Sequence, residues 1–318
     1  VGEVFTGFVV VRGRELRSRK DGQPFLKLEL GDRSGRVFAV IWENGEEIYH
    51  DLPEGSIIKV QGLMEQYQEN RILNIRRWRK KRDDEPIPIG ELLARSNQDP
   101  QKQWERLEGM LKTIRQPHLR TLIDRFLSDP EFKARFSRAP AGKLWHHNTI
   151  GGLLEHTVSL MRLVRYLGRL YPEVDRELLL VGAFLHDIGK IEELATDPII
   201  DYTDSGRLIG HIVLGAEKVA RLIATIPDFP GDQRDHLLHL ILSHQGSPSQ
   251  GSPVVPKTRE AFLLHFADEI DSKMGAFQRL SASREDEERW KFVKLLDRHL
   301  YLGETKESDE LGAPRLTS

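Results

Sequence analysis

Four residues between positions 156 and 268 have side chains of the types that can bind divalent metal ions, and they lie in mainly apolar stretches of the sequence. His156 falls in one mainly apolar stretch, His186 and Asp187 are adjacent in a second, and Asp268 lies in a third. A buried carboxylate without a cation is costly, which favours a metal partner for Asp268. A single histidine of this kind is more often a core residue with satisfied nitrogens. Together, however, the four predict a nitrogen and oxygen site for a divalent ion.

Two more histidines extend this predicted site to a second ion. His211 and His244 open and close further apolar helical stretches, and Asp187 is the natural bridge between two ions. Two close metals activate a water and clamp a phosphate in the same step. Lys190 follows Asp187 by three residues on the same helix face, where it is placed to stabilise a phosphoryl oxygen or the leaving group. Gly189 is expected to let a substrate approach closely.

The other histidines show no such pattern. Five are assigned to ordinary core packing: His118, His236, His239, His265 and His299. His50 is assigned to the surface. Asp271, three residues after Asp268, is expected to be a surface residue or a partner of a ligand rather than a ligand.

The composition restricts the chemistry further. The 318 residues include no cysteine, which excludes disulfides, thiolate nucleophiles, cysteine zinc sites and iron–sulfur clusters. Hydrophobic residues make up 39% and charged residues 30%, a globular balance, and no apolar run reaches the roughly 18 residues of a membrane span. The N-terminus has no signal-peptide pattern. We therefore expect a cytoplasmic protein of about two domains without a membrane partner, and the sequence leaves open a homo-oligomer.

Secondary-structure patterns divide the chain into two domains. Residues 1–82 alternate in the manner of short strands, whereas residues 101–303 have apolar side chains at helical spacing. Residues 83–100 are rich in proline and acidic residues, which predicts a linker. Residues 304–318 have little apolar content and are expected to form a flexible tail.

Five strand-like segments and one short helix predict an OB-fold barrel for the first domain. The strands are expected near residues 8–11, 25–30, 37–42, 57–60 and 72–75. The helix is expected near Glu46–His50, between the third and fourth strands. In the second strand, alternate leucines from Leu26 to Leu30 lie on one face. The expected fold class is therefore multi-domain α+β, a five-stranded barrel followed by an all-α domain.

The charge distribution is compatible with a polyanion partner for the first domain. Residues 1–82 contain 16 Lys or Arg and 12 Asp or Glu, a balance of +4, and the rest of the chain has a balance of −6. A basic surface without a partner explains this equally well. OB barrels commonly bind single strands through aromatic rings and cations. The candidate contacts are Phe25, Lys27, Phe38, Trp42 and Tyr67. For Phe38 and Trp42, burial in the core is the alternative.

Five segments between about residues 140 and 275 resemble the HD-domain phosphohydrolase superfamily. They are WHHNTIGGLLEHT, LLLVGAFLHDIGKIEEL, GRLIGHIVLGAEKV, LILSHQGSPSQGSPVVPKTREA and FADEIDSKM. The combination of GGLLEHT, HDIGK and LSHQG followed by GSP is specific, whereas HD alone is not. With an OB-like domain ahead of them, the chain is similar, more narrowly, to the YhaM-type 3′–5′ exoribonucleases. The resemblance implies an HD-domain helical bundle for residues 101–303.

The resemblance also implies roles for the site residues. The main ion would be held by His156, His186, Asp187 and Asp268, and the second by His211 and His244. Lys190 would face the phosphate beside Asp187. Gln245 replaces the second member of a His-His pair that two-metal families commonly have, so we expect a weaker, exchangeable or absent second ion. His147 is expected to line the substrate entry, and Arg207 to contact a phosphate.

The identity of the ion is less determined than its ligands. Nitrogen-rich ligands favour manganese, iron, cobalt, nickel or zinc over magnesium, although metal availability decides in the cell. The expected cofactor is therefore one or two divalent ions per chain, with manganese as the first choice.

Three functional hypotheses follow. The first is a 3′–5′ exonuclease that hydrolyses single-stranded RNA, with single-stranded DNA left open, through a metal-activated water, and releases nucleoside 5′-monophosphates. Its polarity is implied by the resemblance alone. The second is an HD phosphohydrolase of small nucleotides. The third is a non-catalytic RNA-binding protein with a metal-stabilised helical domain, which the complete ligand set and the aligned lysine argue against.

Overall fold

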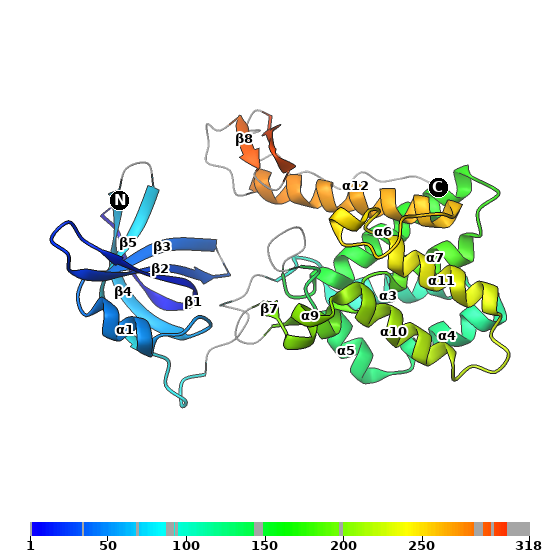
Figure 1. The fold of residues 1–318 in the computed structure, drawn as a ribbon, viewed down its shortest axis with the longest axis horizontal. Helices are drawn as coiled ribbons and strands as arrows, with labels where there is room; N and C mark the ends of the chain where they lie inside the picture. The colour runs from blue at the N-terminus through cyan, green and yellow to red at the C-terminus, as the bar shows by residue number, and fades with distance from the viewer. Residues whose placement is uncertain are drawn as a thin grey trace.

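A β-barrel and a helical domain follow one another along the chain in the computed structural model (Figure 1). The structure describes residues 2–33, 35–67, 70–86, 92, 95–142, 149–196, 200–282, 289–293 and 296–303. Part of the predicted linker and the whole predicted tail lie outside these residues. The domain boundaries therefore stay predictions, although the two parts have separate hydrophobic cores.

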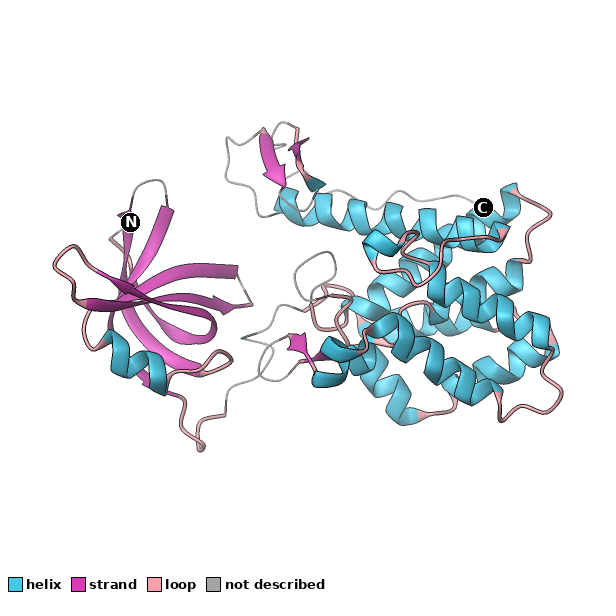
Figure 2. Ribbon diagram, viewed as in Figure 1, coloured by secondary structure: helices cyan, strands magenta, loops and turns pink. Residues whose placement is uncertain are grey.

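The N-terminal strands close into a barrel in the order β1-β2-β3-β5-β4 (Figure 2). They are β1 (Val4–Ser18), β2 (Pro24–Asp32), β3 (Gly35–Ile41), β4 (Ile57–Tyr67) and β5 (Asn70–Lys80), with helix α1 (Gly45–Asp51) between β3 and β4. Strand β1 pairs with both β2 and β4, which closes the barrel, and the pairing of β3 with β5 is parallel. The OB-fold prediction is confirmed. The strands extend beyond the predicted segments because pairing continues through their polar ends.

The alternation predicted for the second strand forms the barrel core. Leu26, Leu28 and Leu30 are fully buried and pack in one hydrophobic cluster. The register of β1 against β2 shifts between Val11 and Gly13. Such a bulge bends the strand and increases its twist, as closure of a small barrel requires.

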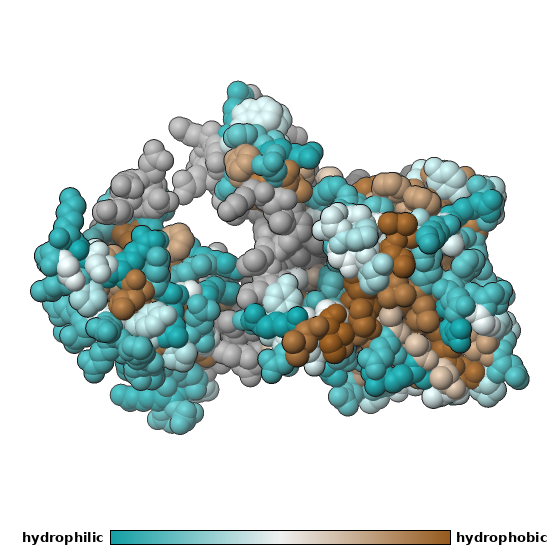
Figure 3. Space-filling model, in the orientation of Figure 1, coloured by the Kyte–Doolittle hydropathy of each residue, from teal (hydrophilic) through white to brown (hydrophobic). Residues whose placement is uncertain are grey.

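Helices make up most of the second domain. They are α3 (Pro100–Leu111), α4 (Pro117–Leu127), α5 (Pro130–Arg138), α6 (Gly152–Leu170), α7 (Arg176–Leu185), α8 (Lys190–Glu193), α9 (Asp204–Leu208), α10 (His211–Ile223), α11 (Gly231–Ser243), the 3-10 turn η1 (Pro248–Gln250) and α12 (Arg259–Ala282). Asp99, Asp129 and Asp175 each accept two backbone N–H groups at the start of α3, α5 and α7, which satisfies donors that helix starts leave unpaired. On the face drawn in Figure 3, apolar side chains gather over this domain, whereas the barrel is mainly hydrophilic.

Helix α7 is the centre of this domain. Every residue from Leu178 to Leu185 is buried, and α4, α6, α11 and α12 pack around it. A helix that is apolar on all sides is stable only in such a position. The His-Asp pair that follows α7 is therefore held in the middle of the helical domain.

Two short strand pairs were not predicted. Strands β6 (Leu194–Ala195) and β7 (Asp201–Tyr202) pair near α8, and β8 (Trp290–Val293) pairs with β9 (Arg298–Tyr301) after α12. The prediction of a purely helical segment from 101 to 303 needs this addition. Between β8 and β9 the sequence has no glycine or proline, the usual sign of a hairpin turn. None of the helices in the described part of the chain has the length and apolar character that a membrane crossing requires.

Candidate metal centre and nucleic-acid groove

Three helices bring the predicted ligands of the main ion together. His186 caps the C-terminal end of α7 and Asp187 follows it, and both are buried. His156 comes from α6, which packs against α7, and Asp268 comes from α12, which contacts both helices. Their positions in the sequence span more than a hundred residues, so only helix packing makes them neighbours.

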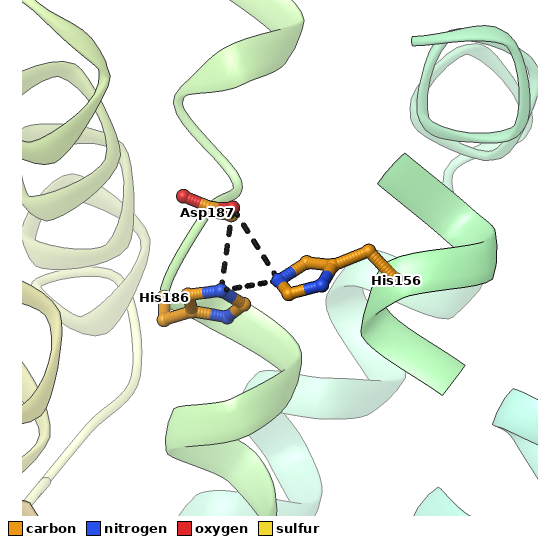
Figure 4. A group of neighbouring side chains, drawn as sticks. All are labelled: His156, His186 and Asp187. Atoms are coloured by element: carbon orange, nitrogen blue, oxygen red, sulfur yellow. Dashed lines mark hydrogen bonds and ion pairs between the residues drawn. The ribbon is translucent and has the colours of Figure 1, made fainter. Parts of the chain in front are cut away.

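One oxygen of Asp187 lies beside two imidazole nitrogens (Figure 4). The Nε2 atoms of His156 and His186 are 3.2 Å apart, and they lie 3.7 and 3.3 Å from Asp187 Oδ2. Asp268 Oδ1 lies 3.3 Å from His156 Nε2. Ligands with bonds of about 2.1 Å to one ion lie about 3.0–3.4 Å from each other. Three of the four spacings lie in this range, and the fourth, between His156 and Asp187, is slightly longer, so the four side chains are placed to share a divalent ion.

The other oxygen of Asp187 lies beside the second pair of histidines. Its Oδ1 is 3.3 Å from His211 Nε2 and 3.6 Å from His244 Nε2. Among the described residues this buried oxygen has no hydrogen-bond partner, which is unusual for a buried carboxylate. Gln245 Nε2 lies 3.3 Å from His211 Nε2. Asp187 thus has the environment of a bridging ligand.

The six predicted ligands form three overlapping groups whose ligand atoms all lie within 4.8 Å of one another. They are His156, His186 and Asp187; His186, His244 and Asp268; and Asp187, His211 and His244. The donor set, nitrogen and carboxylate oxygen without sulfur, suits a divalent transition metal. The residues present therefore fit a divalent metal centre.

Backbone carbonyls orient two of the histidines. His186 Nδ1 donates to the Ala183 carbonyl at 2.9 Å, and His244 Nδ1 donates to the Ile241 carbonyl at 2.7 Å. Both acceptors lie three residues earlier, at the end of the preceding helix. A proton on Nδ1 leaves the lone pair on Nε2, which is the atom that faces Asp187.

Carboxylates orient the other two histidines. His156 Nδ1 donates to Asp271 at 2.7 Å, and Asp271 also accepts a hydrogen bond from the Ser159 hydroxyl. His211 Nδ1 donates to Glu193 Oε1 at 2.9 Å, and the same oxygen accepts the His211 backbone N–H at 3.0 Å. Partners of this kind fix the tautomer and raise the basicity of a metal ligand.

The charges in the site are strongly coupled. Burial disfavours a protonated His156, but the carboxylates of Asp268 and Asp271 outweigh burial and raise its pKa to about 10. Burial also disfavours an ionised Asp187, yet Lys190 and His186 hold the pKa of that carboxyl well below its usual range. Lys190 Nζ donates to Asp187 Oδ2 at 2.6 Å. The carboxylate is therefore ionised, as a metal ligand must be.

An open cavity of about 420 Å³ adjoins the two aspartates. It is lined by Asp187, Lys190, His244, Gln245, Gln250, His265, Asp268, Glu269, Ser272, Lys273 and Leu296. His265 was assigned to the core, but it is only half-buried, lines the cavity and donates from Nδ1 to the His244 carbonyl at 2.9 Å. The core assignments of His236 and His299 are wrong, because both are exposed. Lys190 thus contacts both Asp187 and the space in which a substrate would lie.

Three other expectations have different outcomes. The expected substrate approach at Gly189 is wrong, because a Cβ there would lie 2.0 Å from the His211 carbonyl oxygen, so the glycine serves close packing of α8 on α10. Arg207 pairs with Asp201 at 3.0 Å and is not among the described residues that line the cavity. His147 lies outside the described residues.

The barrel carries a second pocket, of about 360 Å³, on its surface. Phe25, Lys27, Phe38 and Trp42 all line it. The rings of Phe25 and Trp42 are 4.8 Å apart, and Lys27 Nζ lies 4.7 Å from the centre of the Phe38 ring. Phe38 is 46% and Trp42 39% exposed, which excludes burial in the core. The side chain of Tyr67 lies outside the described residues.

Comparison with known proteins agrees with this arrangement. The family model of the OB-fold nucleic acid binding domain matches residues 9–80, and that of the HD domain matches residues 153–273. The 3′-5′ exoribonuclease YhaM of Oceanobacillus iheyensis is 33% identical over 279 residues, which cover 88% of this chain and 87% of that protein. The chain belongs to the YhaM 3′–5′ exoribonuclease family. YhaM of Shouchella clausii is 32% identical over 88% of this chain and 86% of that protein, and YhaM of Bacillus subtilis is 31% identical over 88% of each.

In this YhaM-family chain, sequence reasoning missed Glu193 and His265 and left Asp271 undecided. Glu193 follows Lys190 in the same short helix, and Asp271 follows Asp268 by one helical turn. A carboxylate or imidazole one turn from a predicted site residue is the signal that could have found all three, since such residues share a helix face.

Proposed function

We propose that this YhaM-family chain is a metal-dependent 3′–5′ exonuclease that hydrolyses single-stranded RNA and releases nucleoside 5′-monophosphates. The observation that carries the proposal is the buried Asp187 carboxylate, which has imidazole Nε2 atoms beside both oxygens and adjoins an open cavity. The 3′–5′ polarity and the RNA substrate come from the relatives, which are named 3′-5′ exoribonucleases.

The proposed ligands divide between two ions. His156, His186, Asp187 and Asp268 would hold the first ion, and Asp187, His211 and His244 would hold the second. When bound, such ions lower the pKa of a water and offset the charge of a phosphate. Manganese is the proposed ion, because these ligands are rich in nitrogen.

Gln245 and Lys190 have distinct proposed roles. Gln245 can offer the second ion only an amide oxygen, so this ion is proposed to bind more weakly than the first. Lys190 lies in the cavity wall with its ammonium beside Asp187, where it can donate to a phosphoryl oxygen or to the leaving group.

The barrel is proposed to hold the strand. The rings of Phe38 and Trp42 are exposed and are accompanied by cations, since Arg19 lies 4.9 Å from the Trp42 ring and Lys27 lies beside Phe38. Stacking and backbone contacts of this kind bind single strands with little base preference. Single-stranded DNA is therefore a substrate to compare with RNA. In this proposal residues 1–82 bind the strand, residues 83–100 link the domains and residues 101–303 hydrolyse it.

The decisive experiment is digestion of a 5′-labelled single-stranded RNA by the full chain with Mn²⁺, with Mg²⁺ and with chelator. We expect a ladder that shortens from the 3′ end with Mn²⁺ and no digestion with chelator. Asp187→Asn should abolish the ladder and keep strand binding. The matched control is Asp201→Asn, which removes a carboxylate outside the site.

The same assay separates the other two hypotheses. A phosphohydrolase of small nucleotides would hydrolyse nucleoside triphosphates or cyclic nucleotides and leave the labelled strand intact. A non-catalytic RNA-binding protein would leave all of these substrates unchanged and would behave alike with and without Asp187→Asn. Either result would contradict the proposed function.

A further inference from the structure

We propose that the β8–β9 hairpin is a second binding platform for single-stranded RNA, which holds the nucleotides next to the 3′ end as that end enters the cavity. The proposal rests on the proposed exonuclease function for its substrate. The matched HD-domain segment ends at residue 273, before this hairpin begins.

The outer face of the hairpin is aromatic. Trp290 pairs with Tyr301 and Phe292 pairs with His299, and in each pair the ring centres are 5.0 Å apart. Because side chains two residues apart share a face of a strand, these four rings lie on the same side. Trp290 is 58% exposed, and Phe292 and Tyr301 are each 51% exposed.

The inner face of the same hairpin carries its two buried side chains. Val293 and Leu300 alternate with the aromatic residues and are only 7% and 6% exposed. The hairpin is thus anchored by its inner face and presents rings with its outer face. Large rings exposed together on an anchored element indicate a binding surface for a ligand or a macromolecule.

The turn of the hairpin reaches the catalytic cavity. Leu296, between the two strands, lines the cavity together with Asp187 and Lys190. Of the two ring pairs, Phe292–His299 is nearer to this turn, separated from it by the pair Val293–Arg298, and the pair Trp290–Tyr301 lies about 7 Å further along the strands. Figure 1 shows the hairpin at the C-terminal end of α12, the helix that supplies Asp268. Two successive pairs of rings therefore lie at increasing distance from the cavity.

The local charge favours a nucleic acid over a protein partner. Within the hairpin itself, residues 289–303, there are four Lys or Arg and one Asp, whereas the four residues directly before it, 285–288, are all acidic. Arg289, Lys291 and Arg298 lie on the two strands or directly beside them, at positions that alternate with the rings and therefore belong to the opposite face. Exposed rings can stack on the bases of a single strand, and cations on the same two strands attract its phosphates.

The test is binding of a labelled single strand of roughly 20 nucleotides to the full chain in chelator, followed by anisotropy. The double variant Trp290→Ala with Phe292→Ala should bind at least about 30-fold more weakly, as expected for the loss of two stacking contacts of about 5-fold or more each. Trp290→Phe, which keeps a ring, should retain most of the affinity. The matched control is Tyr166→Ala, another exposed ring, 61% exposed on α6, which should bind like the unchanged chain.

A second measurement keeps the two proposals separate. With Mn²⁺, the ratio of turnover on the long strand to turnover on a dinucleotide should fall in the double variant and stay constant in Tyr166→Ala. Weaker binding without any hydrolysis by the unchanged chain would support the platform and contradict the exonuclease. Unchanged RNA binding and an unchanged turnover ratio in the double variant would overturn the platform. A double variant that loses only self-association would also overturn it, because the rings would then bind a second copy of the chain. If the double variant misfolds, crosslinking of 4-thiouridine RNA to the unchanged chain tests the proposal instead. We expect crosslinks to residues 289–303, and crosslinks confined to the barrel and the cavity would overturn the platform.

Discussion

Gly189 links the metal centre to helix packing, and Gly189→Ala tests this link. A Cβ at this position would lie 2.0 Å from the His211 carbonyl oxygen and 2.6 Å from the Gly215 nitrogen. Both are backbone atoms, so no side-chain rotation can make room. Non-bonded heavy atoms are comfortable at about 3.5 Å, so α10 must move away from α8 by more than about 1 Å. His211 is the first residue of α10 and would move with it.

The expected cost follows from two opposing effects. The backbone of Gly189 is right-handed, with φ −67°, so alanine is compatible with it and recovers about 0.5–1 kcal/mol of chain entropy. Overpacking of a close contact costs about 1–3 kcal/mol and occasionally more. The contact at 189 is with backbone, which places it at the upper end. We expect a net loss of about 2 kcal/mol, which lowers the Tm of the helical domain by about 4–8 °C.

Thermal unfolding and calorimetric Mn²⁺ titration of the full chain check this prediction. Gly189→Ala should have a lower Tm and should lose the weaker of the two Mn²⁺-binding events. Binding of the first ion should be retained, because none of its ligands comes from α10. Gly109→Ala is the matched control, because this exposed glycine of α3 has no atom within 4 Å of an added Cβ. The control should melt at the same temperature or slightly higher. If Gly189→Ala melted like the control and kept both binding events, the packing argument would be refuted.

Three further predictions concern the groove, the second ion and pH. Trp42→Ala and Phe38→Ala should each weaken binding of a labelled single strand about 5- to 100-fold. Binding as tight as that of the unchanged chain would exclude the barrel pocket as the strand site. Gln245→His should tighten the weaker Mn²⁺ event in a calorimetric titration, since imidazole is a better ligand than an amide oxygen, and no change would place Gln245 away from the ion. In the metal-free protein the pKa of His156 is raised from 6.5 to about 10, so its contribution to stability is present below pH 6.5 and lost as pH rises through about 10. Metal binding must displace that proton, so Mn²⁺ affinity should rise with pH and calorimetric titrations in two buffers should show proton release. Binding without proton release would contradict a protonated His156.

The strand alternation and the helical spacing were predictable because they are local. The leucines from Leu26 to Leu30 alternate in the sequence and all point into the barrel. His211 begins α10 and His244 caps α11, as predicted, because apolar spacing marks where helices lie. The burial of a strand or helix face follows from the spacing of apolar residues that are close in the sequence, so a single sequence is enough to predict it.

The β8–β9 hairpin shows where this reasoning fails. Its strands are four residues each and the sequence between them has no glycine or proline, so it has neither the length nor the turn residues that predict strands. Val293 and Leu300 are buried only because the folded chain places other residues against them. A pattern this short specifies a hairpin only in its tertiary context.

The sequence by itself determined the chemistry available to this protein: no thiolate ligand, and histidines and aspartates in apolar stretches that suit a divalent ion. Tertiary structure decided how they are used. Asp271 reaches His156 across 115 positions of the chain, and Glu193 reaches His211 across 18, and these contacts set which nitrogen faces the site. Residue type determines what a side chain can bind, whereas its orientation depends on hydrogen bonds from elements that only packing brings together.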